Sequence, residues 1–133
     1  MPRATGPFEV ALKPLPIDQE SEALLLGRMS VDKHFHGELE GSSSGQMLTG
    51  GTSIRNSAAY VAIERVTGTL KGRKGSFTLQ HTGVMNRGVP SLVITIVPDS
   101  GTDQLEGLRG TMTINVEAGR HSYQLDYTLG DRG

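Results

Sequence analysis

Residues 108–129 have the sequence LRGTMTINVEAGRHSYQLDYTL, in which apolar and polar side chains alternate on both sides of Ala118-Gly119. This period of two is typical of a β-hairpin with one buried face. A turn at Ala118-Gly119 sets Val116 near His121, Ile114 near Tyr123, Met112 near Leu125 and Gly110 near Tyr127. The predicted apolar face holds Met112, Ile114, Val116, Tyr123, Leu125 and Tyr127, and the predicted polar face holds Thr111, Thr113, Asn115, Ser122, Gln124, Asp126 and Thr128.

The same alternation recurs in residues 57–85. A turn centred on Gly72-Arg73 is predicted to pair Lys71 with Lys74, which sets Leu70 opposite Gly75, Gly68 opposite Phe77, Val66 opposite Leu79 and Glu64 opposite His81. The apolar face would then carry Glu64, Val66, Leu70, Phe77, Leu79 and His81. The other face, with Arg65, Thr67, Thr69, Ser76, Thr78 and Gln80, is predicted to meet solvent or a polar interface, apart from Val61 and Ile63 near its start. An acid and an imidazole are therefore expected side by side on an apolar face.

Alternation of this kind continues along the whole chain, with Gly, Pro, Asn, Asp and Ser clusters between the runs. The strands are expected at roughly 5–13, 24–40, 44–52, 57–70, 75–85, 91–98, 108–117 and 121–129. Residues 17–26 are interpreted as a loop that leads into a strand, although Asp18 could cap a turn of helix. Closing such a sheet buries its apolar faces and removes its edges, so we expect an all-β fold, an eight-stranded antiparallel β-barrel, with residues 1–133 as one domain.

Composition narrows the function classes. The 133 residues include 13 Lys and Arg against 14 Asp and Glu, a net charge of -1, which disfavours nucleic acid and anionic membranes as partners. The absence of cysteine removes disulfides and thiolate chemistry and is consistent with a reducing compartment. The start of the chain has no apolar signal region, and the apolar run 23–26 is too short to span a bilayer. We expect a soluble, cytoplasmic protein with no membrane partner.

Glu64 and His81 are the candidate catalytic residues. In an apolar barrel each would shift the pKa of the other, as general acids and bases require. The alternative is a buried, mutually satisfied structural pair. Tyr123 and Tyr127 share the predicted interior and could donate hydrogen bonds to a carbonyl or an oxyanion, although most interior tyrosines pack and find one partner.

His34, His36 and Glu40 form an H-x-H run followed by a carboxylate, with a spacing like that of a metal-binding cupin strand. The glycine expected ahead of the histidines is displaced, and no second motif supplies a later histidine. The alternation turns Val31, Phe35 and Leu39 toward the core, so both histidines are predicted to point outward with Glu38 and Glu40. A plain surface role is favoured, with metal binding as the minor alternative and no cofactor expected.

Three runs together resemble a known family: residues 64–70 (ERVTGTL), residues 72–83 (GRKGSFTLQHTG), and residues 97–110 with their Gly-Thr turn and Leu108-Arg109-Gly110. With Ala4-Thr5-Gly6-x-Phe8-x-Val10 and Phe35-x-Gly37-x-Leu39-x-Gly41, they are similar to domain of unknown function 3224, a small bacterial family. That family is similar in fold to allene oxide cyclase and dirigent proteins. The resemblance implies an eight-stranded barrel with an apolar cavity, commonly homo-oligomeric. Residues 92–95 (LVIT) replace a strand that usually carries tryptophan, which implies a more aliphatic lining.

These inferences leave three hypotheses for the function. The first is an isomerase or cyclase that acts on an apolar reactive intermediate, with Glu64 and His81 as acid and base. The second is a ligand-binding or carrier barrel without turnover. The third is a packed oligomeric scaffold, in which residues such as Phe77 fill the barrel. The expected lining of a cavity is Val66, Phe77, Leu79, Ile94, Met112, Ile114, Tyr123, Leu125 and Tyr127.

Overall fold

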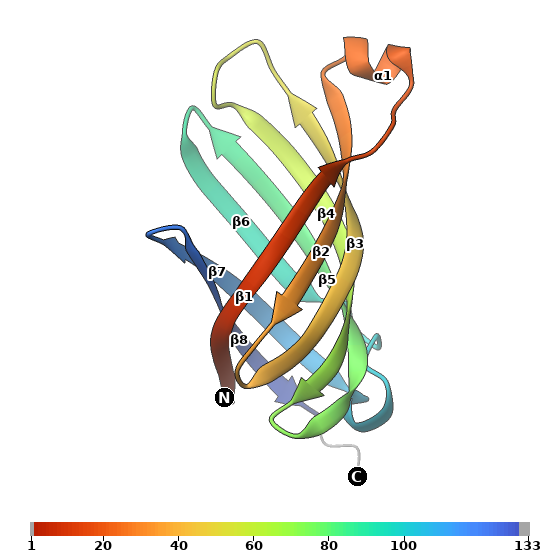
Figure 1. Cartoon of the computed structure of the whole chain (residues 1–133), viewed down its shortest axis with the longest axis vertical. Coiled ribbons are helices and arrows are strands. Elements are labelled where there is room, and N and C mark those ends of the chain that lie inside the picture. Colours follow the sequence, from red (N-terminus) through yellow and green to blue (C-terminus); the bar gives the residue numbers. More distant parts are fainter. Residues whose placement is uncertain (1, 131–133) are drawn as a thin grey trace.

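Successive strands are joined by turns or by longer loops with a short helix, and each strand pairs antiparallel with its neighbours along the chain (Figure 1). The structure, a computed structural model, describes residues 2–130. Its strands are β1 (Arg3–Pro14), β2 (Leu26–Phe35), β3 (Leu39–Gly51), β4 (Ala58–Leu70), β5 (Arg73–Asn86), β6 (Val89–Ile96), β7 (Leu108–Glu117) and β8 (Arg120–Leu129). Because β1 also pairs with β8, the sheet closes on itself. The predicted eight-stranded antiparallel barrel is confirmed.

In the described part of the chain, two helical segments lie between strands. Helix α1 (Gln19–Ala23) begins after Asp18, whose Oδ1 atom accepts a 2.7 Å hydrogen bond from the backbone N–H of Ser21. The prediction of a plain loop at 17–26 was therefore wrong, and the N-cap explains why. The 3₁₀ helix η1 (Asp103–Leu105) lies between β6 and β7. Within residues 2–130, neither helix is long and apolar enough to cross a bilayer.

The predicted strand at 24–40 is divided in the structure. β2 ends at Phe35, and the chain reverses through Gly37, whose φ of 96° lies in the left-handed region that favours glycine. β3 consequently starts at Leu39 rather than at residue 44. The backbone N–H of His36 donates to Pro7 O at 3.0 Å, which fixes this turn against β1.

The register of the β7–β8 hairpin is the predicted one, with Val116 opposite His121 and Ile114 opposite Tyr123. The register predicted for β4–β5 was wrong by two residues. Lys71 and Gly72 form the turn, with φ values of 47° and 85°, and Leu70 pairs with Arg73. Positive φ at both central residues is the geometry that matches the twist of a two-residue hairpin. A shift of two keeps every side chain on its predicted face.

The core occupies the part of the barrel away from α1. The fully buried side chains there include Phe35, Leu39, Leu70, Phe77, Leu79, Leu105 and Leu125. Leu105 belongs to η1, so this short helix adds its side chain to the packed end. One end of the barrel is therefore solid, which leaves the end near α1 as the place for a cavity.

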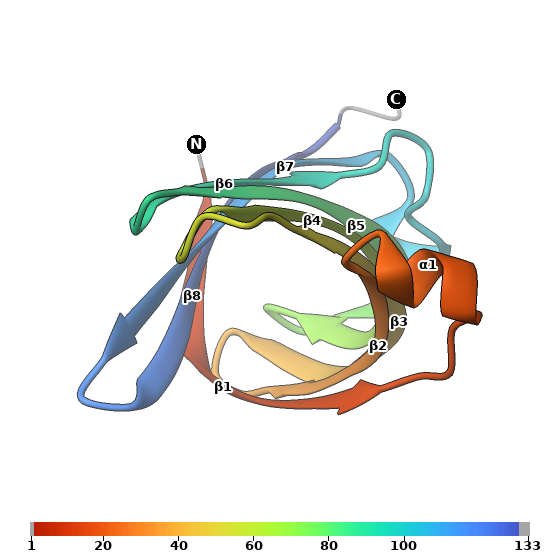
Figure 2. The same ribbon diagram turned by 90° about the horizontal axis from the view of Figure 1, so that it is seen from above.

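The strand pairing is weakest between β6 and β7. Within the described chain their register consists of Ile94 opposite Met112 and Thr95 opposite Thr111. Beyond this contact β6 extends to the end of the barrel that carries α1 (Figure 1), whereas the β7–β8 hairpin projects away from the barrel when seen from above (Figure 2). The wall of the barrel therefore parts on this side, near the end that α1 marks.

Candidate functional site

A buried carboxylate, Glu64, binds three side chains at once. Its Oε2 atom lies 2.7 Å from Lys33 Nζ and 2.5 Å from His81 Nε2, and its Oε1 atom accepts a 2.6 Å hydrogen bond from Ser43 Oγ. Glu64 is 1% exposed, His81 4% and Lys33 7%. We call Lys33, Ser43, Glu64 and His81 the charged cluster. Lys33 and His81, two residues that can carry a positive charge, therefore contact the same oxygen atom of Glu64.

Neighbouring strands supply the cluster. Lys33 on β2 pairs directly with Ser43 on β3, and Glu64 on β4 pairs with Gly45, two residues further along β3. A Cβ atom at Gly45 would lie 2.0 Å from Ile63 O and 2.6 Å from the Cα atom of Glu64. Only glycine lets β3 approach the strand that carries Glu64 this closely.

The environment keeps Glu64 ionised. Burial by itself raises the pKa of this carboxyl, but the hydrogen bond with His81, the charge and hydrogen bond of Lys33, and the Ser43 hydroxyl outweigh it. Together they lower the pKa from 4.5 to about 2. At neutral pH Glu64 is therefore an anion that holds its partners, and it has no proton to donate.

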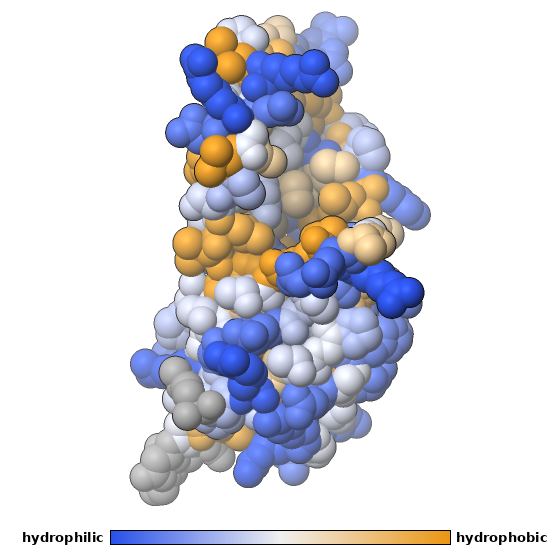
Figure 3. Space-filling model, turned by 90° about the vertical axis from the view of Figure 1, so that its left-hand side faces the viewer, coloured by the Kyte–Doolittle hydropathy of each residue, from blue (hydrophilic) through white to orange (hydrophobic). Residues whose placement is uncertain are grey.

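A cavity of about 230 Å³ opens above the charged cluster, on the side of α1. Apart from Lys33, Glu64 and His81, its wall is mainly aliphatic and aromatic: Phe8, Val10, Leu12, Val31, Met47, Tyr60, Ala62, Leu92, Ile114, Val116 and His121. Leu92 and Val116 come from the two strands that part, so the cavity reaches the gap between β6 and β7. Figure 3 views this side of the molecule, where hydrophobic residues gather at mid-height.

The residues expected to line a cavity are divided between wall and core. Ile114 lies on the wall. The others, Val66, Phe77, Leu79, Ile94, Met112, Tyr123, Leu125 and Tyr127, belong to the packed core cluster, and the wall residues given above do not include them. The residues differ in their position along the barrel axis. Alternation identifies the inward face of a strand, but it does not tell which inward residues pack in the core and which line a cavity.

Tyr123 has a structural role in this geometry. Its hydroxyl accepts from Leu39 N at 2.9 Å and donates to His36 O at 2.7 Å. It thereby ties β8 to the turn between β2 and β3. Tyr60 is the tyrosine on the cavity wall, and burial, followed by the nearby Glu64 charge, raises the pKa of its phenol. Tyr60 is therefore a neutral hydrogen-bond donor at physiological pH.

Sequence reasoning missed Lys33, Ser43 and Tyr60. For Lys33 a signal was present, because it has the same parity as Val31 and Phe35, both of which were predicted to face the core. A lysine at an inward position of a barrel strand needs an acid nearby. Its aliphatic stem also brings Nζ to 5.3 Å from the centre of the Phe8 ring.

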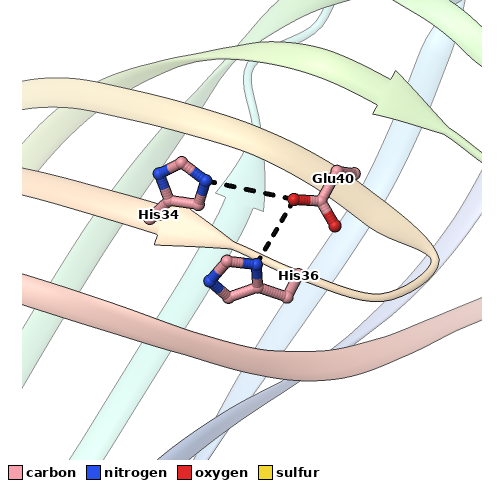
Figure 4. A group of neighbouring side chains, drawn as sticks. All are labelled: His34, His36 and Glu40. Atoms are coloured by element: carbon pink, nitrogen blue, oxygen red, sulfur yellow. Dashed lines mark ion pairs between the residues drawn. The ribbon is translucent and has the colours of Figure 1, made fainter.

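His34, His36 and Glu40 lie on the outer surface, as predicted (Figure 4). His36 Nδ1 is 3.3 Å and His34 Nε2 is 3.9 Å from Glu40 Oε2. The two imidazole rings stack with centroids 4.7 Å apart. These three side chains, here called the surface triad, are separate from the charged cluster inside the barrel.

A separate groove of about 830 Å³ lies outside the barrel along β1, β7 and β8. It is larger than the internal cavity, but outward-facing polar side chains such as Thr113, Asn115 and Gln124 line it. None of the charged cluster reaches it. The internal cavity is therefore the better candidate site, because buried charged groups meet apolar walls there.

Fold and site define a small antiparallel meander barrel, solid at one end, with charged residues buried at the foot of an apolar cavity. The chain belongs to the family described as "Protein of unknown function (DUF3224)", which matches residues 4–127. A similar solved structure is a protein of unknown function from this family from Shewanella oneidensis MR-1, determined at 1.84 Å. It is 45% identical, with a TM-score of 0.93 over 98% of each chain. No curated protein matches the sequence.

Proposed function

We propose that the protein binds a small, largely apolar molecule in the internal cavity and that His81 moves a proton on it, promoting an isomerisation or cyclisation. One observation carries the proposal: a lysine, a glutamate and a histidine are buried together at the foot of an otherwise apolar cavity. Sites of this kind suit proton transfer because low dielectric strengthens every charge that faces the ligand.

Glu64 and His81 take different roles in this proposal. Since Glu64 is ionised, its carboxylate accepts a hydrogen bond from His81 Nε2–H and fixes the ring. Within residues 2–130, Nδ1 of His81 has no protein partner, so it is the nitrogen that can accept a proton from a ligand. Glu64 is thus a positioning residue and His81 the general base.

Lys33 and Tyr60 complete the mechanism. A carbonyl oxygen on the ligand would gain negative charge as His81 removes a proton from the adjacent carbon. The Lys33 ammonium and the Tyr60 hydroxyl are the wall groups able to stabilise that oxyanion. His81 then returns the same proton to a different carbon. The double bond moves, and no oxidant or reductant is needed.

The size of the cavity limits the ligand. A cavity of about 150 Å³ accommodates benzene, and drug-sized sites begin near about 300 Å³. A volume of about 230 Å³ suits a single substituted ring or a short chain. The resemblance to allene oxide cyclase and dirigent barrels, which steer a reactive apolar intermediate, stays a prediction that agrees with this size and polarity.

Self-association and a cytoplasmic location also stay predictions. The outer face of β3 to β6 supports the first, because Leu48, Val61, Ile63, Val84 and Val93 are each about half exposed. Leu48 and Val61 are direct cross-strand partners. Light scattering on the wild type and Val61→Lys tests it. A wild-type monomer would contradict the prediction.

The second candidate function is a carrier that binds without turnover. The observation in its favour is that Glu64 already has partners on both oxygens, as a purely structural cluster would. A packed scaffold is the third alternative. The solid core favours it at one end of the barrel, whereas the cavity argues against it at the other.

Binding is tested first with cyclohex-2-enone, an apolar enone of suitable size. Met47 lies on the cavity wall, so its ¹³C-labelled methyl group should shift on titration, whereas the methyl of the core residue Met112 should shift less. Ala62→Phe, which fills the cavity, should weaken binding at least tenfold. An unchanged Met47 signal at saturating enone would favour the packed scaffold.

Turnover is tested by the loss of acidic C–H hydrogens of the enone to D₂O, followed by NMR. His81→Gln should slow this exchange about 10²-fold or more, with enone affinity within tenfold of wild type. Glu64→Gln should slow it less and alter its pH profile, as expected for a positioning residue. Glu22→Gln on α1 is the matched carboxylate control. Equal exchange in wild type and His81→Gln would leave only the carrier.

A further inference from the structure

The surface triad unites three side chains that transition metals favour. His34 lies on β2, His36 in the turn that follows, and Glu40 on β3. Their ligand atoms all lie within 4.8 Å of one another, and no lysine or arginine forms an ion pair with any of them in the described chain. Two imidazoles and one carboxylate on the β2–β3 hairpin form a donor set suited to Zn²⁺ and similar ions.

The distances are close to those of a coordination sphere. Zn–N and Zn–O bonds of about 2.0–2.2 Å place tetrahedral ligands about 3.3–3.5 Å apart. Glu40 Oε2 lies 3.3 Å from His36 Nδ1 and 3.9 Å from His34 Nε2. In Figure 4 both rings turn a nitrogen toward this oxygen. Small side-chain rotations are therefore enough to bring all three atoms onto one ion.

Neighbouring groups orient the ligands. Gly37 N–H donates to Glu40 Oε1 at 3.3 Å, which leaves Oε2 directed at the two histidines. Glu9 on β1 binds His36 Nε2 at 3.1 Å. A carboxylate that accepts from one ring nitrogen fixes the tautomer in which the other, here Nδ1, is free to bind metal. The surface triad thus combines three metal-ligand atoms with neighbouring groups, Glu9 and the Gly37 N–H, that hold two of its side chains in place.

We propose that His34, His36 and Glu40 form a Zn²⁺-binding site on the outside of the barrel, with Glu9 as the carboxylate that positions His36. Three protein ligands leave a further coordination position open to solvent or to an exogenous ligand. The site joins β2 to β3 and, through Glu9, to β1. It is independent of the internal cavity, so the two proposals stand or fall separately.

The test uses the full chain without a polyhistidine tag, stripped of metal and titrated with ZnCl₂ at pH 8 by calorimetry. We expect one Zn²⁺ per chain. Affinity should fall at least tenfold in His34→Ala and in Glu40→Gln. Glu9→Gln should weaken binding by about tenfold, the lower end of the range for such supporting carboxylates, and by less than either ligand variant does. Glu38→Gln, a nearby exposed carboxylate outside the triad, is the matched control and should bind as the wild type does.

Imidazole NMR provides a readout that needs no variant. Addition of ZnCl₂ should move the ring signals of His34 and His36 and leave those of His81 and His121 in place. Absence of binding, equal affinity in Glu40→Gln and wild type, or shifts spread over all histidines would overturn the proposal and leave an ordinary surface ion-pair cluster.

Discussion

His81 Nε2 lies 2.5 Å from Glu64 Oε2, although the two residues are not cross-strand partners. Glu64 stands opposite Leu79 on the β4–β5 ladder, and His81 stands opposite Ala62. The contact is therefore diagonal across the inward face of the sheet. Diagonal neighbours lie about 7–8 Å apart at the backbone, a span that long side chains such as these bridge.

The free energy of unfolding should fall between pH 4.5 and about 2, because Glu64 becomes protonated. Its pKa is lowered from 4.5 to about 2 on folding, so the stability it supplies is complete above pH 4.5 and lost as the pH falls toward 2. Urea unfolding at several pH values should give a constant gap between wild type and Glu64→Gln from pH 7 to about 5, then a shrinking one. A gap that does not change down to pH 2 would contradict this account.

Lys33→Met should destabilise the fold by about 3–5 kcal/mol, because it leaves a buried anion without its cation. The double variant Lys33→Met with Glu64→Leu removes both charges and should be at least about 2 kcal/mol more stable than the sum of the single changes predicts. Urea unfolding of the four proteins forms the cycle. Strict additivity would mean that the pair is not coupled.

Gly45→Ala should cost about 2 kcal/mol or more, since its Cβ would press against the backbone of Ile63 and Glu64. Gly50→Ala on the same strand is the control. Its Cβ would meet Leu26 at 3.8 Å, an ordinary contact, so its unfolding free energy should stay within about 0.5 kcal/mol of wild type. Thermal and urea unfolding compare the two, and equal losses would argue against close approach as the cause.

Tyr123→Phe should lower the unfolding free energy by about 1–3 kcal/mol, because the buried N–H of Leu39 loses its partner. Tyr60→Phe removes a hydroxyl that has no protein partner among the described residues, so it should leave stability nearly unchanged. In the enone assay the order should reverse, with Tyr60→Phe slowing exchange more than Tyr123→Phe. A large stability loss in Tyr60→Phe would show that its hydroxyl is structural.

Local pattern determined which side chains face inward. Alternation identified both faces of β4–β5 and β7–β8. These faces stayed correct although the turn was predicted at Gly72-Arg73 and lies at Lys71-Gly72, because a register shift of two residues preserves the faces. It also brought Glu64 and His81 to one apolar face. Periodicity is a property of each strand alone, so it needs no knowledge of the rest of the chain.

Only the closed barrel decided which inward residues meet and where space remains. Lys33 comes to Glu64 because β2, β3 and β4 are neighbours in a staggered sheet, a relationship that no single hairpin contains. The same stagger packs Phe77 and Leu125 at one end and leaves a cavity beside Met47 and Tyr60 at the other. Closure of the barrel depends on contacts between residues far apart in the sequence, and it sets the strand order, the shear and the short pairing of β6 with β7. The sequence of one strand encodes only which of its side chains share a face.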